Sequence, residues 1–587
     1  MKLTYFVKID EPHLHLLKVE MAISEITESE IILTMPAWTP GSYLIRDFSR
    51  NVRSLSAHSS DGRALETRKK DKSSWRVLTS GSADLRISYQ VFCEELSIRS
   101  THLDASHAFI LGTSAFMYME GYKDQALEIS FSIPGNWHIS TSLEKTTDNI
   151  YRAINYDVLV DSPVEIGTHL SGTFIVDGKE HEVALYGQYS GDFQKLLNDM
   201  QKIVEATLRI FEHAPYKRYV FILQAYQGNQ MGGLEHSASC AVSLDSSMIF
   251  DDDYYKRLMS VIAHEYFHTW NVKRIRPVEL GPFNYREENY TTLLWFSEGV
   301  TDYFADLIIL RAKLIDQVKY MEFLGESIKM IEFMPGSLET SLAESSFDSW
   351  IRFYKPSSDD INSYISYYLK GKIIGLMMSR RIASLTLGAK SLDQLLHMLY
   401  EKFRKDGKGF TEKDLLAALK DISGQDFTDF FNKFIRGTDK IDFDSELDEM
   451  GLKIERTHSA ESRASLSWSG MIVKRDGMAY TVAAVVKGKP AYRAGINSGD
   501  EVVAINGARF RDENTSAIVK GGKVMLDSFR SSGGEKAGIT VFRRNNLMNI
   551  QTETEQLPFD SYKITEIADQ GEKKKILNRV LFSAVTL

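Results

Sequence analysis

Hydrophobic and polar residues alternate along the first third of the chain. Short alternating or β-branched runs such as EIILTMP, ADLRISYQVF and ALEISFSIP are separated by Gly, Pro, Asn and Asp. A period of two with turn residues between the runs is typical of half-buried strands. The pattern predicts an N-terminal β domain over residues 1–170, most simply a β-sandwich.

The pattern changes after residue 170. The run YVFILQAY predicts a strand, whereas KRLMSVIAHEYFHTW and LLWFSEGVTDYFADLIILR place apolar residues at helical spacing. We assign residues 171–310 to a mixed domain and residues 311–450, where helical spacing dominates, to a helical domain. Strand-like runs return over 451–555, and a more polar tail covers 556–587. The sequence therefore predicts a multidomain α+β protein.

Composition narrows the class of protein. A chain of 587 residues is too long for one core, and 43% hydrophobic with 25% charged residues is ordinary for a soluble protein. The net charge of −9 is spread along the chain, without the basic stripe of a nucleic-acid-binding protein. The two cysteines, Cys93 and Cys240, exclude a disulfide scaffold and favour a reducing compartment. We expect a cytoplasmic protein without a membrane span, unless a signal was removed from a longer chain.

The stretch VIAHEYFHTW places two histidines four residues apart. On a helix, His264 and His268 lie on the same side one turn apart, so they can hold one metal ion. Glu265 can then act as general base on a water at that ion, as in the zincins. Histidine is rare in this chain, 14 of 587 residues, so chance is a poor explanation. We expect one Zn²⁺ per chain.

A zinc site of this type commonly takes a glutamate as its third protein ligand. The spacing found in many two-helix metallopeptidases leads to Glu287, in the polar, loop-like stretch NYREENY. Further on, Glu298 lies on an apolar helix with Asp302 one turn later. We choose Glu298, because Asp302 can then accept the second ring N–H of a ligating histidine and fix its tautomer.

Four stretches together resemble one family: HEYFHTWNVKRIRP, LLWFSEGVTDYF, GGLEH and the N-terminal MPAWTPGSYLIRDFSRNV. They are similar to the glycyl aminopeptidase family of PDZ-containing metallopeptidases, gluzincins related to thermolysin and the alanyl aminopeptidases. The resemblance implies a thermolysin-like zinc catalytic domain over 171–310 and a long insertion before the ligand glutamate. It also implies removal of small N-terminal residues, Gly or Ala, from peptides with a free amino terminus.

The motif GGLEH resembles the family's edge-strand motif, whose glutamate binds the α-ammonium of the substrate. By this resemblance Glu235 anchors the amino terminus, and a carboxylate one residue away from the scissile bond suits that role. Gly232 and Gly233 would let the strand backbone approach the substrate closely. The basic run of Lys273, Arg274 and Arg276 is typical of a solvated face, although at this position it can also pair with carboxylates near the cleft or meet a peptide C-terminus.

The stretch SYISYYLKG resembles the Tyr-x-Lys-Gly motif of the related aminopeptidases, in which the tyrosine hydroxyl donates to the developing oxyanion. Tyr368 is the candidate that this alignment selects. Tyr364 and Tyr367 are close alternatives, because tyrosines crowd this stretch and any of them can simply be a core residue.

The stretch KGKPAYRAGINSGDEVVAING resembles a bacterial-type PDZ domain over 451–555. Such a module holds peptide C-termini by strand addition, or here it could shape the catalytic cleft. Three other functions stay open: a zinc endopeptidase in which Glu235 anchors no amine, a PDZ-based peptide-binding scaffold with a vestigial metal site, and a hydrolase of a non-peptide substrate. The intact metal residues argue against the scaffold.

Overall fold

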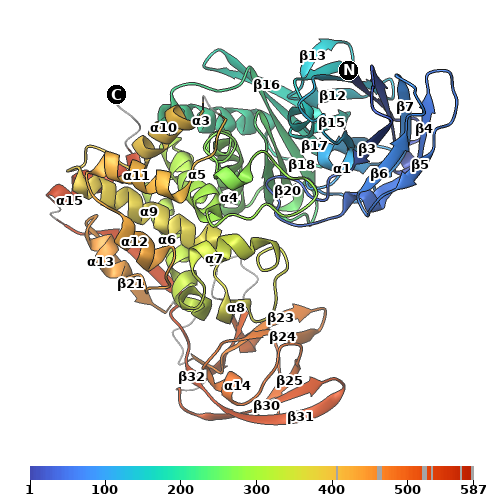
Figure 1. Ribbon diagram of the computed structural model, residues 1–587. Helices are drawn as coiled ribbons and strands as arrows, with labels where there is room; N and C mark the ends of the chain where they lie inside the picture. Colours follow the sequence, from blue (N-terminus) through green and yellow to red (C-terminus); the bar gives the residue numbers. More distant parts are fainter. Residues whose placement is uncertain (405–406, 459–465, 518–524, 531–532, 569–570, 583–587) are drawn as a thin grey trace. The chain divides into compact units, whose positions relative to one another are not determined.

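The computed structural model describes residues 1–404, 407–458, 466–517, 525–530, 533–568 and 571–582 (Figure 1). Part of the predicted tail, residues 569–570 and 583–587, lies outside this description. The chain divides into two compact units. The first comprises Met1–Tyr290, Phe304–Leu314 and Leu396–Thr411, and the second comprises Thr291–Tyr303, Ile315–Leu395 and Glu412–Leu587.

The amino-terminal part of the first unit is β-rich, as the alternating pattern predicts. Its largest sheet has the order β13-β14-β11-β1-β2-β7-β4, and β1 and β11 run parallel. Every second side chain of β2 is buried, so one face of this sheet lies on the core. The strands are β1 (Lys2–Lys8), β2 (Leu16–Ser24), β4 (Val52–Ser59), β7 (Leu85–Phe92), β11 (Leu127–Ser132), β13 (Glu144–Thr147) and β14 (Ile150–Ala153).

Two four-stranded sheets complete this β-rich part, in the orders β10-β3-β6-β5 and β12-β15-β9-β8. One apolar core joins residues from all three sheets. The strands are β3 (Glu30–Thr34), β5 (Thr67–Lys69), β6 (Ser74–Leu78), β8 (His102–Leu103), β9 (His107–Ile110), β10 (Tyr118–Met119), β12 (His138–Thr141) and β15 (Val164–Gly167). Two short helices, α1 (Gly112–Ala115) and α2 (Tyr156–Val160), lie between strands in the sequence.

A five-stranded mixed sheet carries the candidate active-site strand. Its order is β16-β17-β18-β20-β19, with β17, β18 and β20 parallel and β19 antiparallel at the edge. Helix α3 packs on β16, and α4 packs on β19 and β20 (Figure 1). The elements are β16 (Leu170–Val176), β17 (Lys179–Gly187), α3 (Phe193–Phe211), β18 (Arg218–Tyr226), β19 (Gly232–Glu235), β20 (Ser239–Asp245) and α4 (Asp252–Phe267). The sheet thus holds an edge strand against α4.

The second unit is mainly helical up to residue 450. Its longest helix, α9, contacts α6, α7, α11 and α15 (Figure 1). The unit boundary falls inside α5 (Val300–Arg311) and α10 (Leu392–Phe403). The other helices are α6 (Gln317–Phe333), α7 (Leu342–Phe347), α8 (Asp360–Ser363), α9 (Tyr367–Leu385), α11 (Glu412–Ser423), α12 (Thr428–Phe434), α13 (Phe443–Asp448) and α15 (Glu572–Phe582).

Strands return in the second unit after residue 451. The main sheet has the order β27-β28-β23-β24-β25-β30-β31, β26 pairs with β25, and a separate apolar core lies beneath. Its strands are β23 (Met471–Asp476), β24 (Ala479–Val485), β25 (Glu501–Ile505), β26 (Ala508–Arg509), β27 (Thr515–Ala517), β28 (Met525–Asp527), β30 (Lys536–Arg543) and β31 (Asn546–Glu553), with α14 (Pro490–Arg493). Smaller sheets join β21 (Leu452–Thr457) to β33 (Ser561–Glu566), and β22 (Leu466–Trp468) to β29 (Phe529–Arg530) and β32 (Glu555–Gln556). The PDZ assignment stays a prediction.

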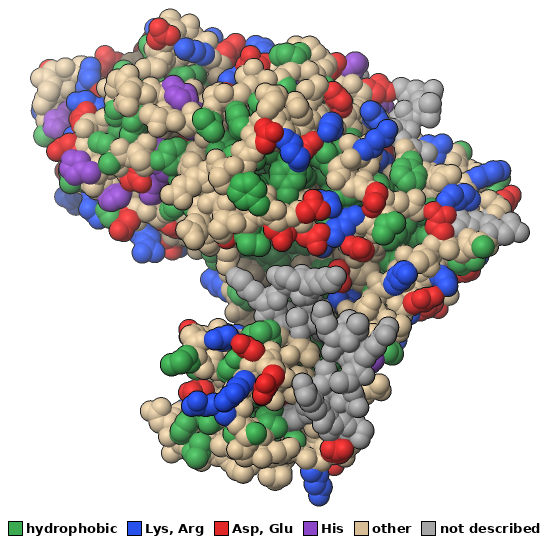
Figure 2. Space-filling view, turned by 180° about the vertical axis from the view of Figure 1, so that it is seen from behind, with side chains coloured by type: hydrophobic (Ala, Val, Ile, Leu, Met, Phe, Trp, Pro, Cys, Tyr) green, Lys and Arg blue, Asp and Glu red, His purple; other side chains and the backbone are tan. Residues whose placement is uncertain are grey.

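Charge is mixed over the visible surface. In Figure 2, basic and acidic side chains are interspersed, in keeping with a net charge that the sequence distributes along the chain. Across the described residues, no helix combines the length and the hydropathy that crossing a bilayer requires.

Candidate active site

Helix α4 delivers the paired histidines to the edge of the five-stranded sheet. Asp251 caps its first turn by accepting a hydrogen bond from the backbone N–H of Tyr254, 2.8 Å away. His264 lies in the last turn, and His268 is the residue after the helix, held by its backbone N–H to His264 O at 3.2 Å. Helical geometry therefore persists across the HEYFH motif and sets both rings on one side.

The two imidazoles face each other in a buried position. The Nε2 atoms of His264 and His268 lie 2.9 Å apart, and the two residues are 8% and 1% exposed. The Nδ1–H of His268 donates to Asn271 O at 2.7 Å, because a carbonyl oxygen only accepts. In the neutral ring the proton is then on Nδ1 and the lone pair on Nε2, which is the tautomer that a ligand binding through Nε2 needs. The pair fits a divalent metal such as zinc.

Glu265 lies against the backbone of the edge strand β19. A Cβ atom added at Gly233 would lie 2.1 Å from Glu265 Oε1, so only glycine leaves room for this carboxylate. Potential ligand atoms of Glu235, Glu265 and His268 all lie within 4.8 Å of one another, and all three residues are buried. The first unit thus brings a histidine and two carboxylates into one small volume.

Glu235 ends β19 and contacts the N-terminal signature segment. A Cβ atom at Gly41 would lie 2.4 Å from Glu235 Oε2, and Gly41 also has a φ of +89° that disfavours other residues. Glu235 is 4% exposed. It lines a cavity of 280 Å³ together with Gly41, Tyr43, Asp161 and Lys273. The signature segment and the glutamate therefore form one wall of a pocket.

The lining of this pocket includes an ion pair. The Nζ of Lys273 donates to Asp161 Oδ1 at 2.8 Å, and His236 Nδ1 lies 3.1 Å from the same oxygen. Burial alone would lower the pKa of Lys273, but the carboxylates of Asp161 and Glu235 raise it above its usual value. Likewise burial would raise the pKa of Asp161, but Lys273 and His236 lower it. The Lys273 side chain, 7% exposed, therefore pairs with a carboxylate near the cleft and does not lie on a solvated face.

The third predicted ligand, Glu298, belongs to the second unit. It is 1% exposed and lies on a π-helical turn, Trp295–Gly299, that leads into α5. Such turns are frequent at functional sites. Asp302 follows in the first turn of α5. The alternative ligand, Glu287, is exposed, and its carboxylate accepts from the Asn284 side chain at 2.7 Å. The choice of Glu298 stays a prediction that this environment favours.

Two glycines hold the Glu298 turn against the start of α9. A Cβ atom at Gly299 would lie 2.5 Å from Gly371 Cα, and one at Gly371 would lie 2.8 Å from Trp295 O. Backbone therefore meets backbone where the two helical segments cross. Gly371 ends the predicted Tyr-x-Lys-Gly motif, so this close approach fixes the turn of Glu298 relative to the turn of Tyr368.

The three candidate tyrosines differ in environment. Tyr364 is 5% exposed, and its hydroxyl donates to Ser345 O at 3.4 Å. Tyr367 is completely buried. Tyr368 is only partly buried, and its ring stacks on Phe353 with the centroids 5.2 Å apart. Partial exposure at the start of α9 favours Tyr368 as the residue able to meet a substrate.

Two family models and one full-length structure resemble this chain. A family model described as the peptidase M61 N-terminal domain matches residues 4–168, and one described as M61 glycyl aminopeptidase matches residues 257–374. A crystal structure of an aminopeptidase N family protein from Idiomarina loihiensis is 29% identical, with a TM-score of 0.91, and covers 99% of this chain and 100% of its own. The family-model match over residues 257–374 covers α4 from Arg257 onward, the Glu298 turn and the start of α9.

Two more distant similarities were found. A curated relative, a probable periplasmic serine endoprotease DegP-like from Hahella chejuensis, is 34% identical over 86 residues; the match covers 15% of this chain and 17% of that relative. The structure of an M1 zinc metallopeptidase from Deinococcus radiodurans is 12% identical, with a TM-score of 0.45, over 72% of this chain and 90% of its own. We draw no site detail from either. The family matches and the full-length structural match show that the chain belongs to the M61 peptidase family and is a metallopeptidase.

Proposed function

We propose that this protein is a zinc aminopeptidase that removes small N-terminal residues, Gly or Ala, from peptides. His264, His268 and Glu298 would hold one zinc ion, and Asp302 would accept a hydrogen bond from a ligating histidine. The buried histidine pair, with the tautomer of His268 fixed by Asn271, supports a resident metal. The preference for small residues rests on the family resemblance.

The bound metal would supply Lewis acidity, which lowers the pKa of a coordinated water and polarises the scissile carbonyl. Glu265 takes the proton from the attacking water and returns it to the leaving amine. Its carboxylate is buried between α4 and β19, so it stays oriented without searching rotamers. The hydroxyl of Tyr368 donates to the oxygen on which negative charge develops.

Glu235 decides between exopeptidase and endopeptidase action. Its carboxylate lies within 4.8 Å of potential ligand atoms of Glu265 and His268, a separation that one amino-acid residue can bridge. A free α-ammonium can pair with Glu235 there, whereas an acylated amine brings no charge to this buried carboxylate. This proximity of Glu235 to the catalytic glutamate is the observation that carries the aminopeptidase proposal.

The C-terminal β-rich part of the second unit would serve as the PDZ module. Its proposed partner is a peptide C-terminus, held by strand addition. The two free, buried thiols, Cys93 and Cys240, support a reducing and therefore cytoplasmic location.

Two substitutions separate the proposed roles. Glu265→Gln keeps the size of the side chain but removes the base, so zinc content should equal that of the unsubstituted protein while hydrolysis of glycyl-arylamide falls by about 10²- to 10⁴-fold. Glu235→Gln should lower kcat/KM for the same substrate by about 30-fold or more, because a buried charge pair is lost. If Glu235→Gln instead leaves the cleavage of free-amine and N-acetylated substrates unchanged, Glu235 does not hold the amino terminus of the substrate.

A further inference from the structure

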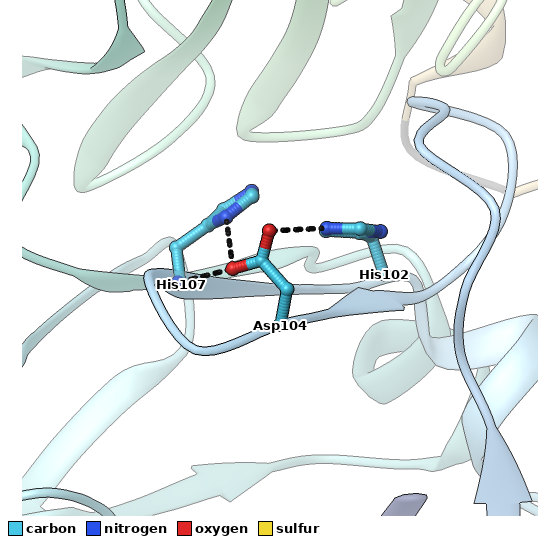
Figure 3. Close-up of side chains that lie close together, drawn as sticks. All are labelled: His102, Asp104 and His107. Atoms are coloured by element: carbon cyan, nitrogen blue, oxygen red, sulfur yellow. Dashed lines mark hydrogen bonds and ion pairs between the residues drawn. The ribbon is translucent and has the colours of Figure 1, made fainter. Parts of the chain in front are cut away.

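A second cluster of metal-ligand residues lies in the β8–β9 hairpin, within the sequence HLDASH. His102 begins β8, Asp104 follows that strand and His107 begins β9 (Figure 3). His102 Nε2 lies 3.3 Å from Asp104 Oδ2, and His107 Nδ1 lies 3.6 Å from Asp104 Oδ1. Figure 3 shows both rings turned toward the carboxylate. None of these residues takes part in the proposed peptidase chemistry.

The tautomer of His102 is fixed by its other ring nitrogen. Its Nδ1–H donates to the backbone carbonyl of Glu94 at 3.1 Å, since that oxygen can only accept. In the neutral ring, Nε2 then carries a bare lone pair that faces the oxygen of Asp104. Two acceptors that face each other at this distance repel unless a cation lies between them. The arrangement therefore calls for a metal ion or a proton.

His107 is held in a ligand-like environment. It is 1% exposed, and its Nε2 lies 3.2 Å from the hydroxyl of Tyr226, which can accept the ring N–H and leave Nδ1 free to ligate. Tyr186 stacks on the ring with the centroids 3.7 Å apart. Gly167, directly opposite in β15, makes room, because a Cβ there would lie 2.9 Å from His107 Cβ.

The distances match a metal site better than a hydrogen-bonded triad. Ligand atoms of a tetrahedral zinc site lie about 3.3–3.5 Å apart, given bonds of about 2.0–2.1 Å. The distance from His102 Nε2 to Asp104 Oδ2 falls in this range, His107 Nδ1 lies near the other oxygen of the same carboxylate, and one ligand atom of each of the three residues lies within 4.8 Å of the others. Neither His102 Nε2 nor His107 Nδ1, both buried, has a hydrogen-bond partner among the described residues. Two orphaned nitrogens thus point at one carboxylate.

The hairpin turn leaves one oxygen of Asp104 for a ligand. Its Oδ1 accepts from the backbone N–H groups of Ser106 and His107, at 2.7 and 3.1 Å, and so holds the turn. Its Oδ2 faces His102. The side chain of Asp104 is 36% exposed, which gives an ion a route from solvent.

We propose that His102 Nε2, Asp104 Oδ2 and His107 Nδ1 form a second metal site, separate from the proposed catalytic one. Two imidazoles and a carboxylate suit a borderline divalent ion, zinc first and nickel or copper as competitors. The ion would tie the hairpin to β17 and β18, whose Tyr186 and Tyr226 contact His107. This proposal does not depend on the aminopeptidase proposal.

Zinc binding by full-length variants tests the site. In a chain with His264→Ala and His268→Ala, which removes the proposed catalytic ligands, metal analysis after equilibration with Zn²⁺ should still find one ion per chain. Adding Asp104→Asn, which keeps the Oδ1 acceptor of the turn, should bring the content close to zero. Tyr226→Phe in the double-variant background, a change that only removes the hydroxyl behind His107, should weaken zinc binding by about 10- to 100-fold.

His138→Ala is the matched control, because His138 is an exposed histidine of β12 in the same small sheet. It should leave zinc binding unchanged. The proposal is overturned if the double variant binds no zinc while it remains folded by circular dichroism. It is also overturned if Asp104→Asn and Tyr226→Phe, each in the otherwise unsubstituted chain, leave stoichiometry and affinity unchanged; a proton shared by the histidines and Asp104 then explains the cluster.

Discussion

The contact between Gly233 and Glu265 makes a sharp prediction about positioning of the catalytic base. Gly233→Ala adds one methyl group on β19, and the backbone there does not need a positive φ. The added carbon would lie 2.1 Å from Glu265 Oε1, 2.2 Å from Cδ and 2.3 Å from Cγ. The whole carboxylate end of the side chain must therefore move.

The size of the effect follows from that distance. Ordinary carbon–oxygen contact begins at about 3.4 Å, so the carboxylate or the strand must shift by about 1.3 Å. A displacement of about 1 Å at a catalytic group can cost about 10²-fold in rate. We therefore expect kcat for glycyl-arylamide to fall by about 10²-fold in Gly233→Ala, with zinc content unchanged, because the methyl group meets the base and not the histidines.

Gly232→Ala is the matched control on the same strand. Its added carbon would lie 3.4 Å from the nearest atom, Arg99 Nη2, the end of a flexible side chain. Steady-state kinetics of both variants should show a large loss only for Gly233→Ala, with similar thermal unfolding for both. Equal activity of Gly233→Ala and the unsubstituted enzyme would refute the assigned position of Glu265, and an equal loss in both variants would indicate damage to β19 instead.

Three further outcomes are expected. By metal analysis, Glu298→Ala should contain about one zinc ion fewer per chain than the unsubstituted protein, while Glu287→Ala contains as many; the reverse result would show that the ligand choice is wrong. Tyr368→Phe should lower kcat by about 10²- to 10³-fold with little change in KM, as expected for loss of an oxyanion donor, whereas Tyr364→Phe should mainly lower thermal stability; comparable kcat losses in both would contradict the assignment. Burial lowers the pKa of Lys370 to about 8, so the unfolded chain binds more protons than the folded chain above that pH. The free energy of unfolding should then rise by about 2 kcal/mol between pH 8 and 10 in the unsubstituted protein but not in Lys370→Met, and an equal pH dependence of chemical unfolding in both proteins would count against it.

Local patterns in the sequence predict much of the fold and the position of the two histidines of the candidate site. Alternation predicted the β-rich amino-terminal part because a period of two directly reports which side chains face a core. The helical spacing around HEYFH predicted a helix, and α4 runs through it to Phe267. The same spacing placed His264 and His268 together, since residues four apart on a helix share a face.

Contacts between distant segments could not be predicted in this way. Nothing local indicates that Gly41 lies against Glu235, or that Asp161 pairs with Lys273 and buries it. The basic run after α4 has the composition of a solvated surface, and only its partner reveals otherwise.

The HLDASH segment shows a different limit. Its histidines and aspartate are residue types that bind metals. Because they lie on two short strands and a turn, however, their spacing in the sequence does not place them on a common face. His102 and His107 become candidates only once Glu94, Gly167 and Tyr226 are seen around them.

Hydrolysis of glycyl-p-nitroanilide and its N-acetyl derivative, with and without a zinc chelator, tests the central claim most directly. The account predicts turnover of the free-amine substrate alone, loss of that turnover with chelator, and recovery on addition of Zn²⁺. Faster cleavage of the acetylated substrate, or activity that chelation does not change, would contradict it.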